Sequence, residues 1–273
     1  MRKSFLALLV TASLFPMTAQ ADVIGVNNEV GISINGLLQK YQEISNGTVP
    51  DSESGVIPGA GIKVSVMHDV FGISHVYAAV SYRYDLGSAS YHGGYQNGSG
   101  NQVPLNSSSY YHIQNIKVRV GKGFLLNDNF LVTPYLQFEH HNWDREVAGV
   151  GAVMGAHEDY RFDAAGFGVK GDVQVMPRLV LTADVNASET LDSSMRFHAE
   201  GGIPGMNFSL GNRPVLGASV GADYRIDGPL HVYTKLAVER FGFAASEVNP
   251  MGYQEPTSRT TQISADVGIA YQF

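Results

Sequence analysis

Residues 264–273 read Ser-Ala-Asp-Val-Gly-Ile-Ala-Tyr-Gln-Phe and end the chain. Ala265, Val267, Ile269, Tyr271 and Phe273 alternate with polar or small residues, and this period of two predicts a β-strand with one apolar face. An aromatic residue with no charged extension after it is an unusual end for a soluble domain. The closing strand of a membrane barrel can end in this way, because its outer face meets lipid. The segment therefore predicts such a closing strand, and the rest of the chain must supply the others.

The first 21 residues have the pattern of a secretory signal peptide. A basic start precedes a short apolar run, and Ala19-Gln20-Ala21 forms an Ala-x-Ala cleavage site. A transmembrane anchor is the alternative, but the run is too short to span a bilayer and Pro16 interrupts it. We expect cleavage before Asp22 and a single mature domain of residues 22–273.

Composition narrows the classes of fold and partner. The chain has 273 residues and no cysteine, which excludes disulfides and thiolate metal sites. The net charge of −7 argues against nucleic acid as a partner. Beyond the N-terminus, no apolar stretch approaches the roughly 20 residues of a membrane helix. Abundant Gly, Tyr and Phe favour an all-β protein.

Ten segments share the alternation of the last one. They lie near Glu29–Tyr41, Gly59–Asp69, His75–Ser88, Tyr110–Gly121, Phe130–Trp143, Glu158–Val175, Leu179–Asn186, Val215–Ile226, Leu230–Phe241 and Ser264–Phe273. Long polar connections alternate with short ones, which is typical of an antiparallel meander with one elaborate end. We predict a ten-stranded antiparallel transmembrane up-and-down β-barrel, or eight strands if the sixth and seventh segments are misread. We also expect an irregularity at Pro134 and a β-bulge near Ala165-Gly166.

The faces opposite the apolar ones carry balanced charge. They hold seven basic and seven acidic residues: Lys63, Arg83, Lys117, Arg119, Lys170, Arg225, Lys235, Asp85, Glu139, Asp172, Asp184, Asp223, Glu239 and Asp266. A β-sandwich would solvate such a face, but the apolar faces have aromatic residues near their ends, as in the girdles of a membrane barrel. A ten-stranded barrel is narrow, so we expect these charges to pair across the lumen around trapped water and to leave no wide pore.

The signal peptide, the loop rhythm and the ending Tyr271-Gln272-Phe273 resemble the small monomeric outer-membrane β-barrels of Gram-negative bacteria. Val132-Thr133-Pro134-Tyr135-Leu136 is similar to a strand of the opacity-type surface barrels. The resemblance implies location in the outer membrane, contact with its lipid and lipopolysaccharide, and a monomer. It also implies that Tyr271 and Phe273 are recognised by the barrel-assembly machinery.

The predicted strand number is also similar to that of the omptin surface proteases. This chain departs from their catalytic pattern, because no Asp lies two residues before a His and residues 89–109 contain no acid. The resemblance to omptins therefore implies a similar barrel shape but identifies no catalytic residues in this chain.

Two groups of residues could still carry chemistry. Glu139 and His141 share the predicted inward face and could form an acid/base pair, although a luminal hydrogen-bonding pair is the preferred interpretation. Asp192, His198 and Glu200 could hold a divalent ion, although a solvated loop is preferred. We therefore predict no enzyme and no cofactor. The expected function is adhesion, surface interaction with host or cell-surface molecules, or envelope integrity through the external loops, with a small channel as the alternative.

Overall fold

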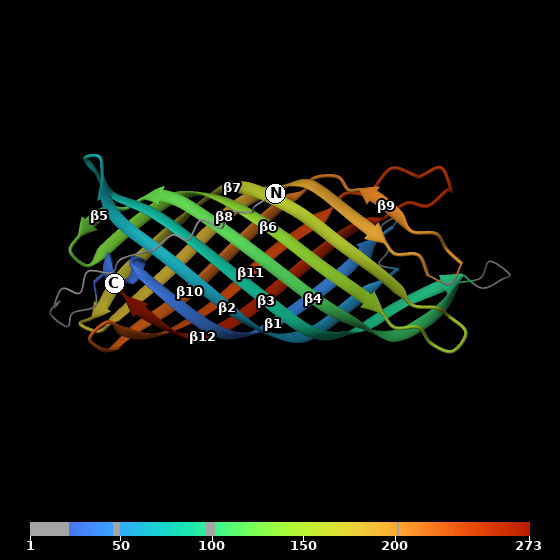
Figure 1. Cartoon of the computed structure of the whole chain (residues 1–273), viewed down its shortest axis with the longest axis horizontal. Helices are drawn as coiled ribbons and strands as arrows, with labels where there is room; N and C mark the ends of the chain where they lie inside the picture. The colour runs from blue at the N-terminus through green and yellow to red at the C-terminus, as the bar shows by residue number, and fades with distance from the viewer. Residues whose placement is uncertain (1–21, 46–49, 97–101, 201) are drawn as a thin grey trace, which may run out of the picture.

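The computed structural model describes residues 22–45, 50–96, 102–200 and 202–273. The predicted signal peptide, residues 1–21, lies outside them. Ten long strands form a closed antiparallel barrel that is much longer than it is wide (Figure 1). The strands are β1 (Glu29–Ile44), β2 (Ser52–Val70), β3 (Ile73–Gln96), β4 (Gln102–Lys122), β6 (Phe130–Val147), β7 (Ala156–Met176), β8 (Leu179–Phe197), β10 (Pro214–Asp227), β11 (Leu230–Phe243) and β12 (Thr257–Gln272). The ten-strand prediction is confirmed.

Three short elements accompany the barrel. They are a 3-10 helix η1 (Gly25–Asn27) and the strands β5 (Phe124–Asn127) and β9 (Met206–Ser209). The strand predicted from the last ten residues pairs with β1 from Glu29↔Gln272 to Ile44↔Thr257 and closes the barrel. No helix among the described residues is long and apolar enough to cross a membrane.

The strands are longer than the alternation predicted. β3 and β4 take up most of the predicted loop at 89–109, and β8 continues to Phe197 instead of ending at Asn186. β4 has 21 residues, which at about 3.3 Å each and a 45° tilt cover roughly 50 Å along the barrel axis. An apolar belt suited to an outer membrane is only about 25 Å tall. About half of the barrel therefore stands beyond such a belt.

The two halves of the barrel have opposite polarity, and β6 shows the change. Its outward residues are apolar from Val132 to Phe138, with Leu136 70% exposed, and polar from His140 onward. Its inward residues change in the opposite sense, from Gln137 and Glu139 to the buried Trp143. One half therefore has an apolar outside and a polar lumen, and the other half has the reverse.

This reversal explains why the predicted bulge at Ala165-Gly166 is wrong. β7 pairs with β6 without a shift from Phe130↔Val173 to Val147↔Ala156. Its two register shifts against β8 lie between Arg161 and Asp163 and between Gln174 and Met176. Phe162 points inward and is buried, whereas Phe167 points outward and is 65% exposed. The apolar residues change face because the surroundings of the strand change.

The irregularity expected at Pro134 is present as a change of pairing partner. β6 pairs with β4 up to Gly121↔Tyr135 and with β5 from Phe124↔Val132. Pro134 lies between these two ladders, where the amide hydrogen that it lacks is not needed for strand pairing on that side.

Candidate functional site: a lumen closed at both ends

A polar cavity of about 280 Å³ lies inside the half of the barrel that has an apolar exterior. Of the fourteen charged residues predicted to face the lumen, eleven line it: Lys63, Arg83, Lys117, Arg119, Lys170, Asp172, Asp184, Asp223, Lys235, Glu239 and Asp266. The other three, Asp85, Glu139 and Arg225, are buried next to it. The alternation thus places all fourteen on the inner face.

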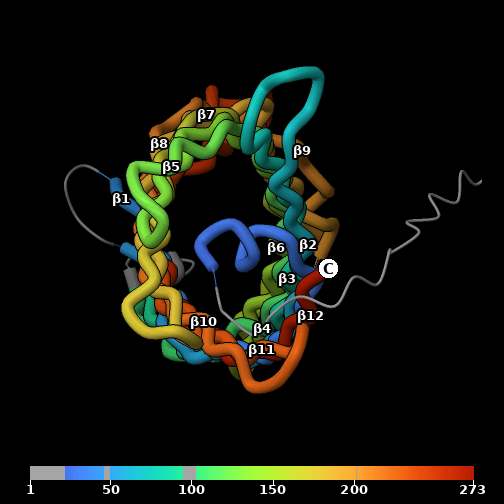
Figure 2. Tube along the Cα trace, turned by 90° about the vertical axis from the view of Figure 1, so that its left-hand side faces the viewer, coloured from blue at the N-terminus to red at the C-terminus, as the bar shows by residue number. Residues whose placement is uncertain are grey.

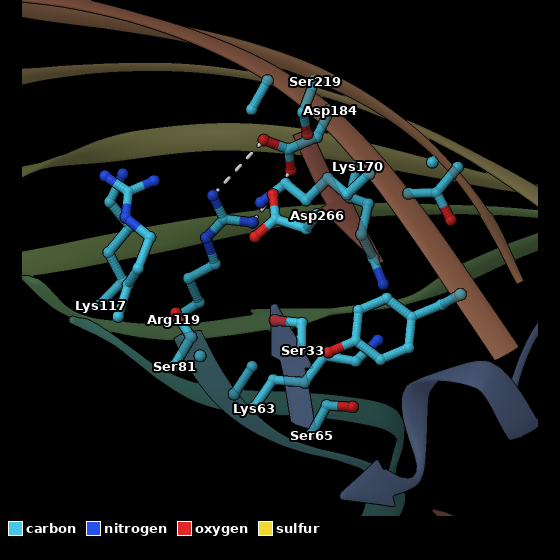
Figure 3. Close-up of a pocket in the computed structure, with 18 of the residues that line it drawn as sticks. Ser33, Lys63, Ser65, Ser81, Lys117, Arg119, Lys170, Asp184, Ser219 and Asp266 are labelled. Atoms are coloured by element: carbon cyan, nitrogen blue, oxygen red, sulfur yellow. Dashed lines mark hydrogen bonds and ion pairs between the residues drawn. The ribbon is translucent and has the colours of Figure 1, made fainter. Parts of the chain in front are cut away.

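Some of these charges pair across the lumen. Arg119 Nη1 on β4 lies 3.2 Å from Asp184 Oδ2 on β8 (Figure 3). Lys117 Nζ, also on β4, lies 3.3 Å from Glu139 Oε2 and bonds Glu239 on the distant strand β11. Such links fill the cross-section with paired side chains.

Other charges pair locally. Arg83 Nε lies 2.9 Å from Asp85 Oδ2, and Lys170 Nζ lies 3.2 Å from Asp172 Oδ2, each pair on one strand. Asp223 bonds His231, and Arg225 bonds Gln272. Lys235 and Asp266 are cross-strand neighbours in register, but among the described residues neither makes a direct ion pair. Sequence reasoning missed Glu29, which lies 2.5 Å from Lys63 Nζ and could have been found because it begins the first predicted strand.

The N-terminal segment lies inside the short-turn end of the lumen. Figure 2 shows it coiled within the barrel. Val23 and Val26 are buried against a cluster that includes Met67 and Leu131. The Asn27 amide donates to Asp172 Oδ2 at 3.0 Å and so joins this plug to the luminal charges. The segment precedes the first predicted strand, and its only sequence signal is the pair of valines three residues apart.

An aromatic plug fills the other half of the lumen. It is built on Tyr41, Tyr111, Trp143, Tyr160 and Phe162, each with at most 2% of its surface exposed. The Trp143 ring lies 5.2 Å from the rings of Tyr41 and Tyr111 and 4.9 Å from that of Tyr160. Such edge-to-face and offset pairs are stabilising beyond the area that they bury. The prediction of a polar lumen therefore holds for one half only.

Arg145 ties the aromatic plug to a ring of carboxylates near the long loops. Its side chain is 3% exposed; Nε lies 2.7 Å from Glu53 Oε1, and Nη1 bonds Glu158. Its guanidinium carbon lies 5.0 Å above the Tyr41 ring, a cation–π contact. A buried charge of this kind is tolerated because it is fully paired.

Glu255, in the connection between β11 and β12, has an unusual ionisation. The Tyr160 hydroxyl donates to its Oε1 at 2.7 Å. Burial, and secondarily the nearby charge of Glu158, raise the pKa of Glu255 to about 8. At neutral pH its protonated form predominates, which limits the negative charge of this cluster.

The candidate acid/base pair lies deep inside the barrel. Glu139 and His141 are 0% and 1% exposed, and His141 Nδ1 is 3.9 Å from Glu139 Oε1. The Asn115 amide contacts both side chains, and the His141 ring stacks on Phe162 at 4.7 Å. The two side chains are therefore linked through the Asn115 amide and make no direct hydrogen bond with each other.

The three loop residues considered for a metal are not brought together. Of Asp192, His198 and Glu200, only His198 belongs to a group of metal-binding side chains in the described chain, and its companions are His157 and Asp159. Glu200 instead forms an isolated backbone bridge with Ile203. Sequence spacing could not have revealed the group, because β7 and the end of β8 bring its members together.

No protein-family model and no curated protein sequence matches the chain. Among solved structures, the chain is similar to the outer membrane protease OmpT from Escherichia coli, with a TM-score of 0.59 and 10% identity over 91% of this chain and 98% of that one. It is less similar to the translocator domain of the autotransporter NalP from Neisseria meningitidis, with a TM-score of 0.42 and 12% identity over 90% and 88%. The β-domain of the Bordetella autotransporter BrkA gives 0.40 and 14% over 89% and 99%. At such identities the likeness is one of fold alone, and only the first exceeds a TM-score of 0.5. The chain has the fold of an outer-membrane β-barrel.

Proposed function

We propose that this protein is a monomeric outer-membrane surface barrel with a closed lumen, which acts through its external half. The half with the apolar exterior lies in the membrane, with the short turns in the periplasm, and the half with the polar exterior stands outside the cell. The signal peptide and recognition of Tyr271 and Phe273 by the assembly machinery would deliver it there. Tyr271 and Phe273 are 41% and 39% exposed, which supports their accessibility.

The observation that carries the proposal is that the lumen is filled at both ends. The N-terminal segment occupies the short-turn end, and the aromatic plug with Arg145 occupies the other. Between them lies a cavity of about 280 Å³ whose charges are largely paired. A conducting pore needs a continuous aqueous path, so this arrangement supports a surface role over a channel.

The same burial supports a function without catalysis. Glu139 and His141 lie beneath aromatic side chains and are at most 1% exposed, so no substrate could reach them without opening the barrel. The external loops and the polar outer wall are then the surfaces available to lipopolysaccharide, host molecules or neighbouring cells.

A planar-bilayer recording of the purified folded barrel tests the proposal. We expect no stable conductance from the wild-type protein or from a variant lacking residues 22–28, because the aromatic plug remains in the variant. Stable, size-defined steps from the wild-type protein would support the channel alternative and refute the closed barrel. Proteolysis of intact cells is the companion experiment: cleavage within residues 148–155 or 245–256 is expected, and protection of both loops would contradict the orientation.

A further inference from the structure

Two histidines and two aspartates gather on the outer wall of the external half. His157 and Asp159 lie on β7, His198 directly follows β8, and Asp144 lies on β6. Their side chains are partly exposed, from 20% for Asp159 to 42% for Asp144. Since Trp143 and Tyr160 point inward, this cluster lies on the opposite face of the wall from the aromatic plug and plays no part in closing the lumen.

The distances are those of a group that could share one ion. Asp159 Oδ2 lies 2.8 Å from His198 Nε2, and Asp159 Oδ1 lies 3.9 Å from His157 Nε2. The binding atoms of these three residues all lie within 4.8 Å of one another. A tetrahedral zinc with bonds of about 2.0–2.1 Å holds its ligands roughly 3.3 Å apart. The separations of 2.8 and 3.9 Å lie on either side of this value.

The backbone beneath the cluster is fixed. The His198 amide donates to the His157 carbonyl at 2.9 Å, so the two histidines are held side by side. Their rings stack in parallel with centroids 4.0 Å apart. Asp144 Oδ2, on a neighbouring strand, lies 3.4 Å from His157 Nε2, so a second carboxylate stands beside the three-residue group.

Charge and ring chemistry favour a metal over a simple His–Asp pair. The unprotonated nitrogen of an imidazole ring is the atom that binds metals, and the group holds two such rings side by side. Two carboxylates and two uncharged imidazoles balance the charge of one divalent ion. Arg161 and His112 line a cavity of about 190 Å³ beside Asp144 and Asp159. Among the described residues Arg161 makes no ion pair with Asp144 or Asp159, so it does not neutralise these carboxylates.

We propose that His157, Asp159 and His198, with Asp144 as the fourth donor, bind one divalent transition-metal ion. Mixed nitrogen and oxygen donors suit Zn²⁺, whereas Ca²⁺ and Mg²⁺ select all-oxygen sites. The bound ion joins β6, β7 and the segment after β8. It thereby stiffens the wall from which the connections after β6 and β8 leave.

A second possible group at the other end of the barrel is already satisfied by protein partners. Glu29, Asp223 and His231 also come together there. Lys63 neutralises Glu29, and His231 bonds both Asp223 and Gln272. Both ring nitrogens of His231 are engaged in these contacts, although Glu29 Oε2 and Asp223 Oδ2 have no hydrogen-bond partner among the described residues. Because its histidine has no free nitrogen, we assign no metal to that group.

Zinc binding by the folded, tag-free barrel in detergent tests the proposal. Equilibrium dialysis against buffered ZnCl₂ should give one equivalent per barrel, and His157→Ala or His198→Ala should each weaken binding at least tenfold. The matched control is His140→Ala, because His140 Nδ1 pairs with Asp163 Oδ1 at 2.6 Å on the same outer face but belongs to no metal-binding group in the described part of the chain. This control should bind zinc as the wild type does. Co²⁺ should give the intense visible absorption of a tetrahedral site, and this absorption should be absent from the double variant His157→Ala/His198→Ala.

Other outcomes would overturn the metal site. Equal zinc binding by the wild type and the double variant would place the metal elsewhere. Absence of zinc binding by the wild type would reduce the cluster to hydrogen-bonded His–Asp pairs. Heat-modifiable gel mobility of every variant verifies that a loss of binding is not a loss of folding.

Discussion

The placement of the membrane belt can be tested on a single strand. On β6, Leu136 and Asn142 both point outward, but Leu136 lies within the apolar run and Asn142 lies beyond it. Six residues at about 3.3 Å amount to roughly 20 Å along the strand, or about 14 Å along the barrel axis at a 45° tilt. That exceeds half of an apolar band about 25 Å tall. If Leu136 is near the midplane, Asn142 is in water.

Arginine at the two positions should therefore have very different costs. Leu136→Arg should lower the free energy of unfolding by about 2–4 kcal/mol, roughly 30- to 700-fold in the equilibrium constant. Asn142→Arg should change it by no more than about 0.5 kcal/mol. Val220→Arg on β10, where Val220 is 57% exposed, should resemble Leu136→Arg.

Denaturant titration in lipid vesicles measures these costs. The chain has one tryptophan, Trp143, and its burial in the aromatic plug makes its fluorescence a reporter of folding for all three variants. A negligible cost for both Leu136→Arg and Val220→Arg would mean that the inside and outside faces are wrongly assigned. An equal cost at Leu136 and Asn142 would mean that lipid covers the polar half as well.

Three further predictions concern the plug, the assembly signal and pH. Trp143→Ala should lower the free energy of unfolding by about 3–5 kcal/mol, because the cavity left among the surrounding tyrosines cannot collapse in a closed barrel. Denaturant titration followed by circular dichroism measures this loss, and a value below about 1 kcal/mol would contradict a packed plug. Deletion of Phe273 should reduce the amount of heat-modifiable barrel in cell envelopes, and wild-type amounts would show that the terminal aromatic is not used as an assembly signal. Because its pKa is raised from 4.5 to about 8, Glu255 contributes stability that is present below about pH 4.5 and is lost as the pH rises through 8. The melting temperature should therefore fall less over this range in Glu255→Gln than in the wild type or in the exposed-loop control Glu247→Gln, and parallel curves would refute the shift.

The sequence was sufficient for the parts of the fold that depend on alternation. Ten strands, their antiparallel order and the inward position of residues such as Lys117 and Asp184 all follow from a period of two. The ends of the strands were predicted less well. The segment 89–109 is rich in Ser, Gly and Asn and looks like a loop, yet cross-strand pairing from Ala89↔Ser109 to Gln96↔Gln102 makes most of it a hairpin.

Alternation does not show whether a face meets lipid, water or the lumen. On β6 the apolar face changes sides between Phe138 and Trp143. If the apolar face is assumed to point outward along the whole strand, the inward and outward residues of one half are assigned wrongly. The same error turned the change of phase in β7 into a predicted bulge. The N-terminal plug and the group of His157 and His198 depend on contacts between segments distant in sequence, which no local pattern contains.

The length of the strands and the closure of the lumen have one physical cause. A barrel that rises well beyond an apolar belt has water around its external wall, so the outward side chains there must be polar, as His140, Asn142 and Asp144 are. Apolar side chains buried on the inside supply the hydrophobic stabilisation that lipid cannot give this half. In a narrow ten-stranded wall, Trp143, Tyr160 and their buried neighbours occupy much of the lumen of this half, which favours the proposed closed barrel. Burial of apolar side chains in the lumen thus accounts both for the stability of the half that lies beyond the belt and for the narrowing of any path through it.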